Sequence, residues 1–366
     1  MTRPRVLLML AHSIEEYDQV RLLSGMGYDV FSLGAYIDPS NPLDDMRPPL
    51  PDAPHHPELK AVVDRIVPTP ENGDRLDLAK RSLPDEVLSW ADVIIAHHLE
   101  QNWLWPQWRR IRGKRVIWRT VGQSGAGNEW AAIPYATDGL EIVRYSPKER
   151  NIPNYAGESA LIRFYKDPED FPEWTGENRW VLNVSQNPLE RQEWVNLPWI
   201  AASLRGLPYS FVGKGTEAVG GVGKVPPDEL VREMSWARAF LYTGTQPASY
   251  TLGLIEAMMA GAPVVSISPE WMRLMPYGPS LFEGHEIAPL FASTPLEAHD
   301  LLERILRDDA YARAVSRVSR ERALALFSRE RAEKAWDGWL MERCPPDPDP
   351  EDIPDVAHVT REEIKA

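Results

Sequence analysis

The stretch from Ala239 to Val265 constrains the fold of this chain more than any other part of the sequence. Its apolar run Ala239–Tyr242 is followed by the polar loop Thr243–Pro247. A helical pattern then ends at Gly261, just before the apolar run Pro263–Val265. The predicted order is strand, loop, helix, strand, which is typical of a parallel α/β sheet. In such a sheet, the loop lies at the carboxyl end of the first strand and leads into the amino end of the helix.

The start of this helix is suited to binding a phosphate. Its first backbone N–H groups have no partner within the helix, and the helix dipole adds partial positive charge there. Glu256 lies a little over one turn beyond Thr251 and Leu252, and its carboxylate suits a diol such as ribose. The pattern therefore predicts a nucleotide site. The alternative is a buried strand-helix-strand unit without a ligand, which any parallel α/β protein contains.

The residues from Glu256 to Val265, EAMMAGAPVV, carry a resemblance to a known family. They resemble the donor-binding signature of retaining glycosyltransferases of the GT-B fold, especially family four (glycosyltransferases group 1). The resemblance implies that Glu256 holds the nucleotide ribose, and that the N–H groups of Thr251 and Leu252 hold the distal phosphate. The first half of the signature departs from the family. Ala248 stands where the family has a glutamate that binds the transferred sugar, eight positions before Glu256.

The family also holds the donor diphosphate with an arginine and a lysine near the start of the second domain. Ser185–Gln186 replaces the expected Gly-Arg, and Arg191 is the nearest match for the lysine. Lys214, between two glycines, is the predicted substitute for the missing cation. Two cations facing two phosphates stabilise the negative charge of the leaving group without a metal. The same reading places Gln246 and Tyr250 near the sugar.

The first half of the chain resembles the family only in its architecture. The run Val6–Leu10, a helix and the run Asp29–Leu33 predict a βαβ opening. Three residues near predicted strand ends are candidates for acid–base or acceptor-positioning roles: His12, His97 and Arg119. The alternative for each histidine is a hydrogen-bonding residue with no role in catalysis.

The stretch Trp103–Arg115 is the most basic and aromatic part of the sequence. Such a stretch can stack bases, grip phosphates or lie on a membrane surface. The alternative is a short amphipathic helix that packs on the sheet before the strand Val116–Trp118.

Length and patterning predict two domains, because single cores stop growing near ~250–300 residues and this chain has 366. The predicted parts are an acceptor-binding Rossmann-like domain at 1–170, a nucleotide-sugar-binding Rossmann-like domain at 171–330, a helix crossing back to the first domain at 331–343, and an acidic proline-rich tail at 344–366.

Composition narrows the function classes. The formal net charge of −14 argues against broad non-specific attraction to nucleic acid or anionic membranes. The single cysteine excludes an intrachain disulfide and a cysteine-based zinc site, which fits a cytoplasmic protein. The run Val6–Ala11 is too short to span a membrane. We expect no metal site, because His55–His56 and Asp44–Asp45 lack metal-binding spacing.

These observations together predict an α/β protein of the GT-B fold, with two Rossmann-like domains facing a cleft. By the resemblance, it transfers a sugar from a UDP- or GDP-linked donor to an acceptor hydroxyl, with retention and without a metal or cofactor. The candidate acceptors are a saccharide or lipid-linked saccharide, a protein hydroxyl, and a hydroxymethyl-pyrimidine in DNA exposed by base flipping. The alternatives are a GT-B epimerase and a catalytically silent binding or scaffold protein.

Overall fold

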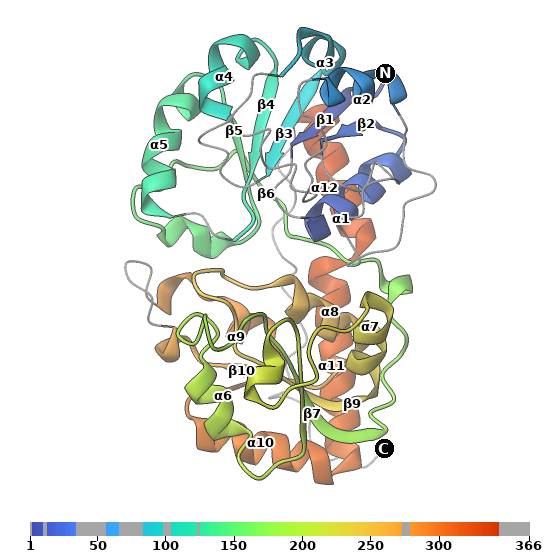
Figure 1. Cartoon of the computed structure of the whole chain (residues 1–366), viewed down its shortest axis with the longest axis vertical. Coiled ribbons are helices and arrows are strands. Elements are labelled where there is room, and N and C mark those ends of the chain that lie inside the picture. Colours follow the sequence, from blue (N-terminus) through green and yellow to red (C-terminus); the bar gives the residue numbers. More distant parts are fainter. Residues whose placement is uncertain are drawn as a thin grey trace. The chain divides into compact units, whose positions relative to one another are not determined.

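The computed structural model describes residues 2–9, 13–33, 56–65, 83–97, 104–122, 125–272 and 279–343. The chain divides into two compact units (Figure 1). Unit 1 comprises Met1–Phe164 and Ala332–Asp347, and unit 2 comprises Tyr165–Arg331 and Pro348–Ala366. The predicted site residue His12 and the predicted tail at 344–366 lie outside the described residues.

Unit 1 is built on a parallel sheet, with strand order β2-β1-β3-β4-β5-β6 in the described residues. The strands are β1 (Arg5–Met9), β2 (Asp29–Ser32), β3 (Val93–His97), β4 (Arg115–Arg119), β5 (Glu141–Arg144) and β6 (Ala160–Leu161). The helices are α1 (Ser13–Gly25), α2 (Pro57–Asp64), α3 (Asp85–Trp90), α4 (Leu104–Ile111) and α5 (Ala126–Thr137). The sequence Val93–Ala96 is apolar throughout and fully or nearly fully buried, as expected for a central strand covered on both faces.

The described part of the basic and aromatic stretch, from Leu104 to Arg115, forms α4 and the connection into β4. Leu104, Trp108 and Ile111 face the core, as the packing alternative predicts. The Trp105 ring stacks on Tyr135 with centroids 4.0 Å apart. Four cations of this stretch contact other residues of unit 1. Arg110 contacts Asp85 and the Leu83 carbonyl, and Arg112 contacts Asp138. Lys114 donates to the Ala91 carbonyl, and Arg115 pairs with Glu141. This stretch is therefore a packed helix with most of its charges paired.

Unit 2 contains a second parallel sheet, whose described strands have the order β11-β10-β9-β7-β8. The strands are β7 (Asn178–Val184), β8 (Tyr209–Val212), β9 (Ala237–Tyr242), β10 (Val264–Ile267) and β11 (Leu290–Ala292). The helices are α6 (Leu197–Ser203), α7 (Pro227–Trp236), α8 (Leu252–Ala260), α9 (Gly284–Ile287), α10 (Pro295–Arg307) and α11 (Asp309–Phe327). The predicted strand-loop-helix-strand unit is present as β9, α8 and β10.

The helix α8 ends where the sequence predicts. Gly261 adopts a φ of 82°, a left-handed conformation that favours glycine, and its N–H bonds back to the Met258 carbonyl. All residues of α8 from Leu254 to Ala260 are buried, because α7 and α11 both pack against it. The helix is thus held on several sides, which fixes the direction of its first turn.

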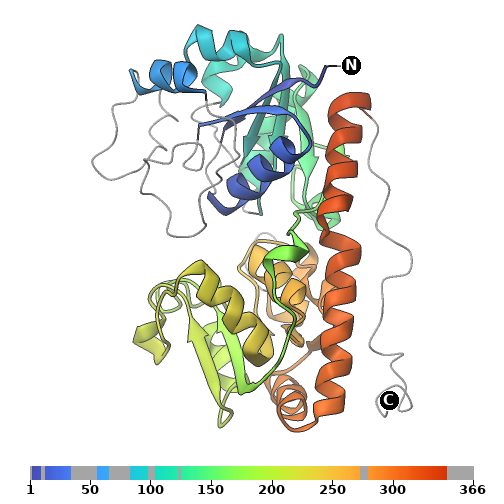
Figure 2. The ribbon, with the colours of Figure 1, turned by 90° about the vertical axis from the view of Figure 1, so that its right-hand side faces the viewer.

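The chain returns to unit 1 through α12 (Arg329–Asp337), which follows α11 (Figure 2). Residues from Ala332 onward group with unit 1. The Arg115 guanidinium donates to the carbonyls of Trp339 and Leu340 at 2.9 and 2.8 Å, and the Tyr28 hydroxyl donates to Asp337 at 2.8 Å. Across the described ranges, the structure has no helix that is long and apolar enough to cross a membrane.

Candidate functional site

The loops at the carboxyl edge of the unit 2 sheet form the candidate site. Strands β7, β8 and β9 are parallel, so the loops that follow Val184, Val212 and Tyr242 leave the same edge. β7 is paired with β8 on one side and with β9 on the other. The strand order therefore reverses between β7 and β9, because the chain adds β8 on one side of β7 and then β9 on the other. Open α/β sheets bind ligands at such a reversal of strand order.

The loops after β7 and β8 are fastened together through their backbones. The Asn187 N–H donates to the Lys214 carbonyl at 2.6 Å, and the Lys214 N–H donates to Gln186 Oε1 at 2.9 Å. Gly213 has a φ of 133°, and a Cβ at this position would lie 1.9 Å from the Ser185 carbonyl oxygen. Only glycine allows this approach, so it fixes the position of Lys214 beside the β7 loop.

Arg191 and Lys214 bring positive charge to these loops. The Arg191 guanidinium lies over the ring of Trp194, 5.5 Å from its centroid, and the Lys214 side chain is exposed. Neither cation has a carboxylate partner in the part of the chain that the structure describes. The structure therefore places both predicted phosphate ligands on neighbouring loops at one edge, and no carboxylate of the described residues neutralises their charges.

The predicted sugar ligand Gln246 is bonded to the β7 loop. Its Nε2 donates to the Glu193 carbonyl at 3.1 Å and to Asn196 Oδ1 at 3.2 Å, and its backbone N–H donates to the Trp194 carbonyl at 2.9 Å. Asn196 in turn donates to the Thr243 carbonyl at 3.1 Å. The Gln246 amide thus ties the β9 loop to the β7 loop, a role that the sequence reading did not include.

The start of α8 differs in one detail from the prediction. The Thr251 N–H donates to the hydroxyl of Tyr242 at 3.0 Å, and Tyr242 closes β9. Burial raises the pKa of Tyr242, so the phenol is neutral. Among the described residues, the Leu252 and Gly253 N–H groups have no protein acceptor. The free N–H groups at this helix start are therefore those of Leu252 and Gly253, one residue later than predicted for Thr251.

Glu256 is buried and paired with a residue that the sequence reading missed. Its Oε1 lies 2.8 Å from the Nζ of Lys166, and the two side chains are 7% and 3% exposed. Lys166 is 90 positions away in the sequence, on the segment that enters unit 2. Its only signal in the sequence is a lysine that directly follows the segment Ile162–Tyr165, in which Arg163 is the one polar residue.

Tyr250, the other predicted sugar ligand, is 1% exposed and packs against Phe327, with ring centroids 5.5 Å apart. Phe327 ends α11, so this contact holds the β9 loop against that helix. Ala248 is also buried. The structure thus gives Tyr250 a packing role, and its contact with the sugar stays a prediction.

In unit 1, the two predicted site residues that the structure describes, His97 and Arg119, lie inside the domain. His97 is fully buried at the end of β3 and pairs in register with Arg119 on β4. The structure corrects the expectation that Arg119 is an available polar group of the following loop. Its guanidinium is 1% exposed and donates to the carbonyls of Arg144, at 3.1 Å, and Ile162. Its Nε also lies 3.7 Å from Glu15.

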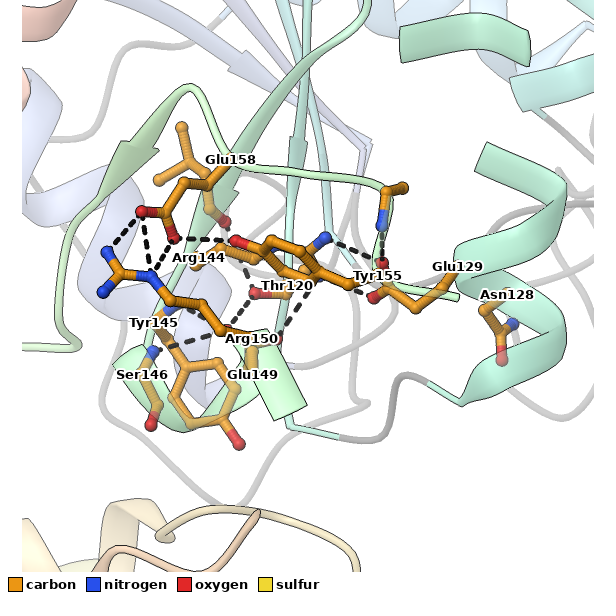
Figure 3. A network of polar contacts seen from close by, with 12 residues as sticks. Thr120, Asn128, Glu129, Arg144, Tyr145, Ser146, Glu149, Arg150, Tyr155 and Glu158 are labelled. Carbon is orange, nitrogen blue, oxygen red and sulfur yellow. Dashed lines mark hydrogen bonds and ion pairs between the residues drawn. The ribbon is translucent and has the colours of Figure 1, made fainter. Parts of the chain in front are cut away.

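A buried polar network lies beside these strands (Figure 3). Arg144 makes a bidentate pair with Glu129, with N–O distances of 2.6 and 2.7 Å, and both side chains are fully buried. Glu149 Oε2 accepts hydrogen bonds from the Thr120 hydroxyl and the Tyr145 N–H, both at 2.9 Å. Burial raises the pKa of Glu149 to about 7, although the Arg144 charge and these hydrogen bonds favour the charged form. This network was not predicted.

Within the described ranges, the His, Cys, Asp and Glu side chains form no cluster of three or more that could hold a metal ion. The polar groups gathered at the unit 2 edge are instead cations, backbone N–H groups and the Lys166–Glu256 pair.

Known proteins resemble this chain in fold and, over part of its length, in sequence. Residues 191–336 match a family model described as glycosyl transferase-like. Sucrose-phosphate synthase from Thermosynechococcus elongatus is similar in structure, with a TM-score of 0.63 and 15% identity over 93% of this chain and 99% of that one. HepE from Anabaena, in complex with UDP and glucose, has a TM-score of 0.62 and 12% identity over 93% and 100%. A glycosyltransferase from Rickettsia africae has a TM-score of 0.61 and 10% identity over 94% and 99%.

No curated protein sequence matches this chain. The structural likeness confirms the predicted fold, two parallel α/β units in the GT-B arrangement of elements along the chain. The family match covers α8, its preceding loop and both loop cations. The chain therefore has the GT-B fold, and its residues 191–336 are similar to a glycosyl transferase-like family.

Proposed function

We propose that this protein transfers a sugar from a nucleoside diphosphate-sugar donor, a UDP-sugar, to an acceptor hydroxyl. The observation that carries the proposal is that the family match at 191–336 contains every predicted donor-binding residue. HepE, a structural neighbour, was crystallised with UDP and with UDP-glucose, which supports a UDP-linked donor.

The chemistry of the unit 2 edge fits a diphosphate. The Leu252 and Gly253 N–H groups supply hydrogen bonds at the positive end of α8. Arg191 and Lys214 supply two full positive charges on the neighbouring loops. As the bond between sugar and phosphate breaks, negative charge grows on the departing diphosphate, and donors already in place stabilise it. This set of groups can support metal-independent transfer.

Retention at the anomeric carbon is the stereochemistry proposed here. In this fold, the departing phosphate can itself accept the proton of the incoming hydroxyl, on the face from which it leaves. No side chain of the described residues is then required as the base. His12 and His97 remain the proposed acceptor-side residues, and we place the acceptor on unit 1 and the protein in the cytoplasm.

The test is a thermal-shift and calorimetry series with UDP-glucose, UDP-N-acetylglucosamine and GDP-mannose. A donor that binds only the folded state raises the melting temperature. We expect at least one of the three to do so, and the free nucleotide to bind as well. If no nucleotide or nucleotide-sugar changes the melting temperature at millimolar concentration, the proposal is wrong.

A second candidate is a silent GT-B binding protein, which is favoured by Ala248 and by Ser185–Gln186 in place of two functional family positions. Isotope tracing distinguishes the candidates. A transferase releases nucleotide in the presence of acceptor or by slow hydrolysis, whereas an epimerase converts the free nucleotide-sugar. A silent protein binds the donor and leaves it unchanged over hours.

A further inference from the structure

The pair formed by Lys166 and Glu256 does more than fill space in unit 2. An ammonium and a carboxylate that are 3% and 7% exposed have both lost most of their water, and the ion pair between them offsets part of that cost. An N–O distance of 2.8 Å is that of a direct charge-assisted hydrogen bond. This contact holds the carboxylate of Glu256 in one orientation.

The backbone of Lys166 is itself fixed. Its N–H donates to the Phe327 carbonyl at 3.0 Å, and it forms an isolated parallel bridge with Ser328. The next residue, Asp167, pairs with Arg329 at 3.0 Å. The lysine stem thus starts from an anchored backbone and reaches α8 through the interior. A buried stem of this kind has few rotamers, so the position of Nζ is well defined.

Glu256 lies four residues beyond the first residue of α8, about 6 Å along the helix axis from the free N–H groups that we assign to phosphate. A carboxylate can accept about four hydrogen bonds, so a lysine N–H and the hydroxyls of a ribose can share it. The Lys166 ammonium fixes the position of Glu256 Oε1 and thereby sets the orientation of the whole carboxylate.

We infer that Lys166 is a positioning residue for nucleotide recognition: it orients Glu256 so that this carboxylate reads the ribose hydroxyls of the donor. The inference rests on the proposed function, because it deepens the description of the same site. Without the ammonium, the carboxylate loses the contact that fixes its orientation, and with it the preference for a diol.

The experiment compares ribose with deoxyribose. Calorimetry measures the affinity for UDP and 2′-deoxy-UDP, and for GDP and 2′-deoxy-GDP, in the full-length chain. In the natural protein we expect the ribonucleotide to bind about tenfold more tightly than its deoxy form. Lys166→Met is expected to weaken ribonucleotide binding about tenfold and deoxynucleotide binding little, so that the ratio falls towards one. Lys166→Arg is expected to keep most of the ratio.

Arg238→Met is the matched control. Arg238 is also a buried cation of unit 2, and it pairs with Asp309, but it lies at the start of β9, at the opposite edge of the sheet. It should lower stability without changing the ribose-to-deoxyribose ratio. If Lys166→Met does not fold, Lys166→Gln keeps a hydrogen-bond donor without the charge, and its ratio is expected to fall by about threefold.

The outcomes separate the inference from the proposed function. If the natural protein binds neither UDP nor GDP, the proposed function fails and the inference fails with it. If the natural protein binds a nucleotide and the folded Lys166 variant keeps the full ratio, only the inference is overturned. A ratio near one in the natural protein also overturns it, because Glu256 then does not read the ribose.

Discussion

The carboxyl edges of the two sheets differ in how they use their charged residues. In unit 1, Arg119 and Arg144 point inward and are bonded to carbonyls and carboxylates of their own domain. In unit 2, Arg191 and Lys214 stand on loops and have no carboxylate partner in the described part of the chain. Charges that are fully used inside a domain stabilise it, whereas charges left available at a sheet edge can bind an anion. The first edge therefore contributes to stability, and the available charges of the second edge support the proposal that it binds the donor.

The largest expected effect comes from breaking the buried network of unit 1. Arg144→Met leaves Glu129 and Glu149 without their cation in the interior. Removing one partner of such a pair is expected to lower the free energy of unfolding by about 3–5 kcal/mol. Urea unfolding of the variant measures the change, and nucleotide affinity at low temperature should not change.

Arg150→Met is the control for this prediction, because Arg150 pairs with Glu158 in the same network but is 55% exposed (Figure 3). We expect a loss of at most about 1 kcal/mol there. Equal losses in the two variants would contradict the distinction between buried and exposed pairs.

The next effect is a pH dependence caused by Glu149. Its pKa is about 7 in the folded protein, which is above the ordinary value near ~4.3 expected after unfolding. The folded state therefore holds a proton that the unfolded state releases between these two values. The stabilising contribution is complete below about pH 4.3 and is lost as the pH rises through 7.

We expect the stability of the natural protein, relative to Glu149→Gln, to fall by about 2–3 kcal/mol between pH 4.5 and pH 8. Chemical unfolding at several pH values measures this difference. Glu158→Gln is the control with the opposite sign. Burial acts to raise the pKa of Glu158, but the hydrogen bonds from Arg150 and Tyr155 outweigh it and lower the pKa. Its contribution is therefore lost as the pH falls. A flat Glu149 profile would show that this carboxylate is charged in the fold.

The sequence was most informative where structure depends on neighbouring residues. The β9, α8 and β10 unit could be predicted because an apolar run, a loop with proline and a closing glycine lie within one short segment. The cations Arg191 and Lys214 could be placed on loops because each follows a strand pattern. The GT-B fold followed from the same local patterns together with the family resemblance.

The remaining features depend on contacts between distant segments. No local pattern shows that the Tyr242 hydroxyl takes the Thr251 N–H, or that Lys166 reaches Glu256 from 90 positions away. We expected the Arg119 guanidinium to be available at a loop, because the sequence places Arg119 at a strand end but does not show the direction of its side chain. In the structure, the Arg119 side chain points into the interior, where backbone carbonyls accept its hydrogen bonds.

The third effect concerns Glu256. Glu256→Ala removes a charged hydrogen-bond acceptor from the proposed ribose site, and we expect nucleotide affinity to fall by about 1–3 kcal/mol. The variant also removes the carboxylate that lies beside the buried Lys166, so stability should fall as well. Calorimetry on folded protein, checked by circular dichroism, separates the two effects. Unchanged nucleotide affinity in a folded variant would remove Glu256 from the site.

The smallest expected effect tests the available charges of unit 2 directly. Lys214 is exposed, so Lys214→Ala should leave the unfolding free energy within about 0.5 kcal/mol of the natural value. If Lys214 binds the diphosphate, the same change should weaken UDP binding by about 1 kcal/mol and UMP binding by much less, because only UDP carries the distal phosphate. The difference in affinity between UDP and UMP should shrink as the salt concentration is raised, since exposed charges are screened.

Arg205→Ala is the control, because Arg205 is an exposed cation just before β8, at the opposite edge of the same sheet. Equal effects of the two variants on UDP would mean that general charge attracts the nucleotide, and the assignment of donor binding to the carboxyl edge would fail.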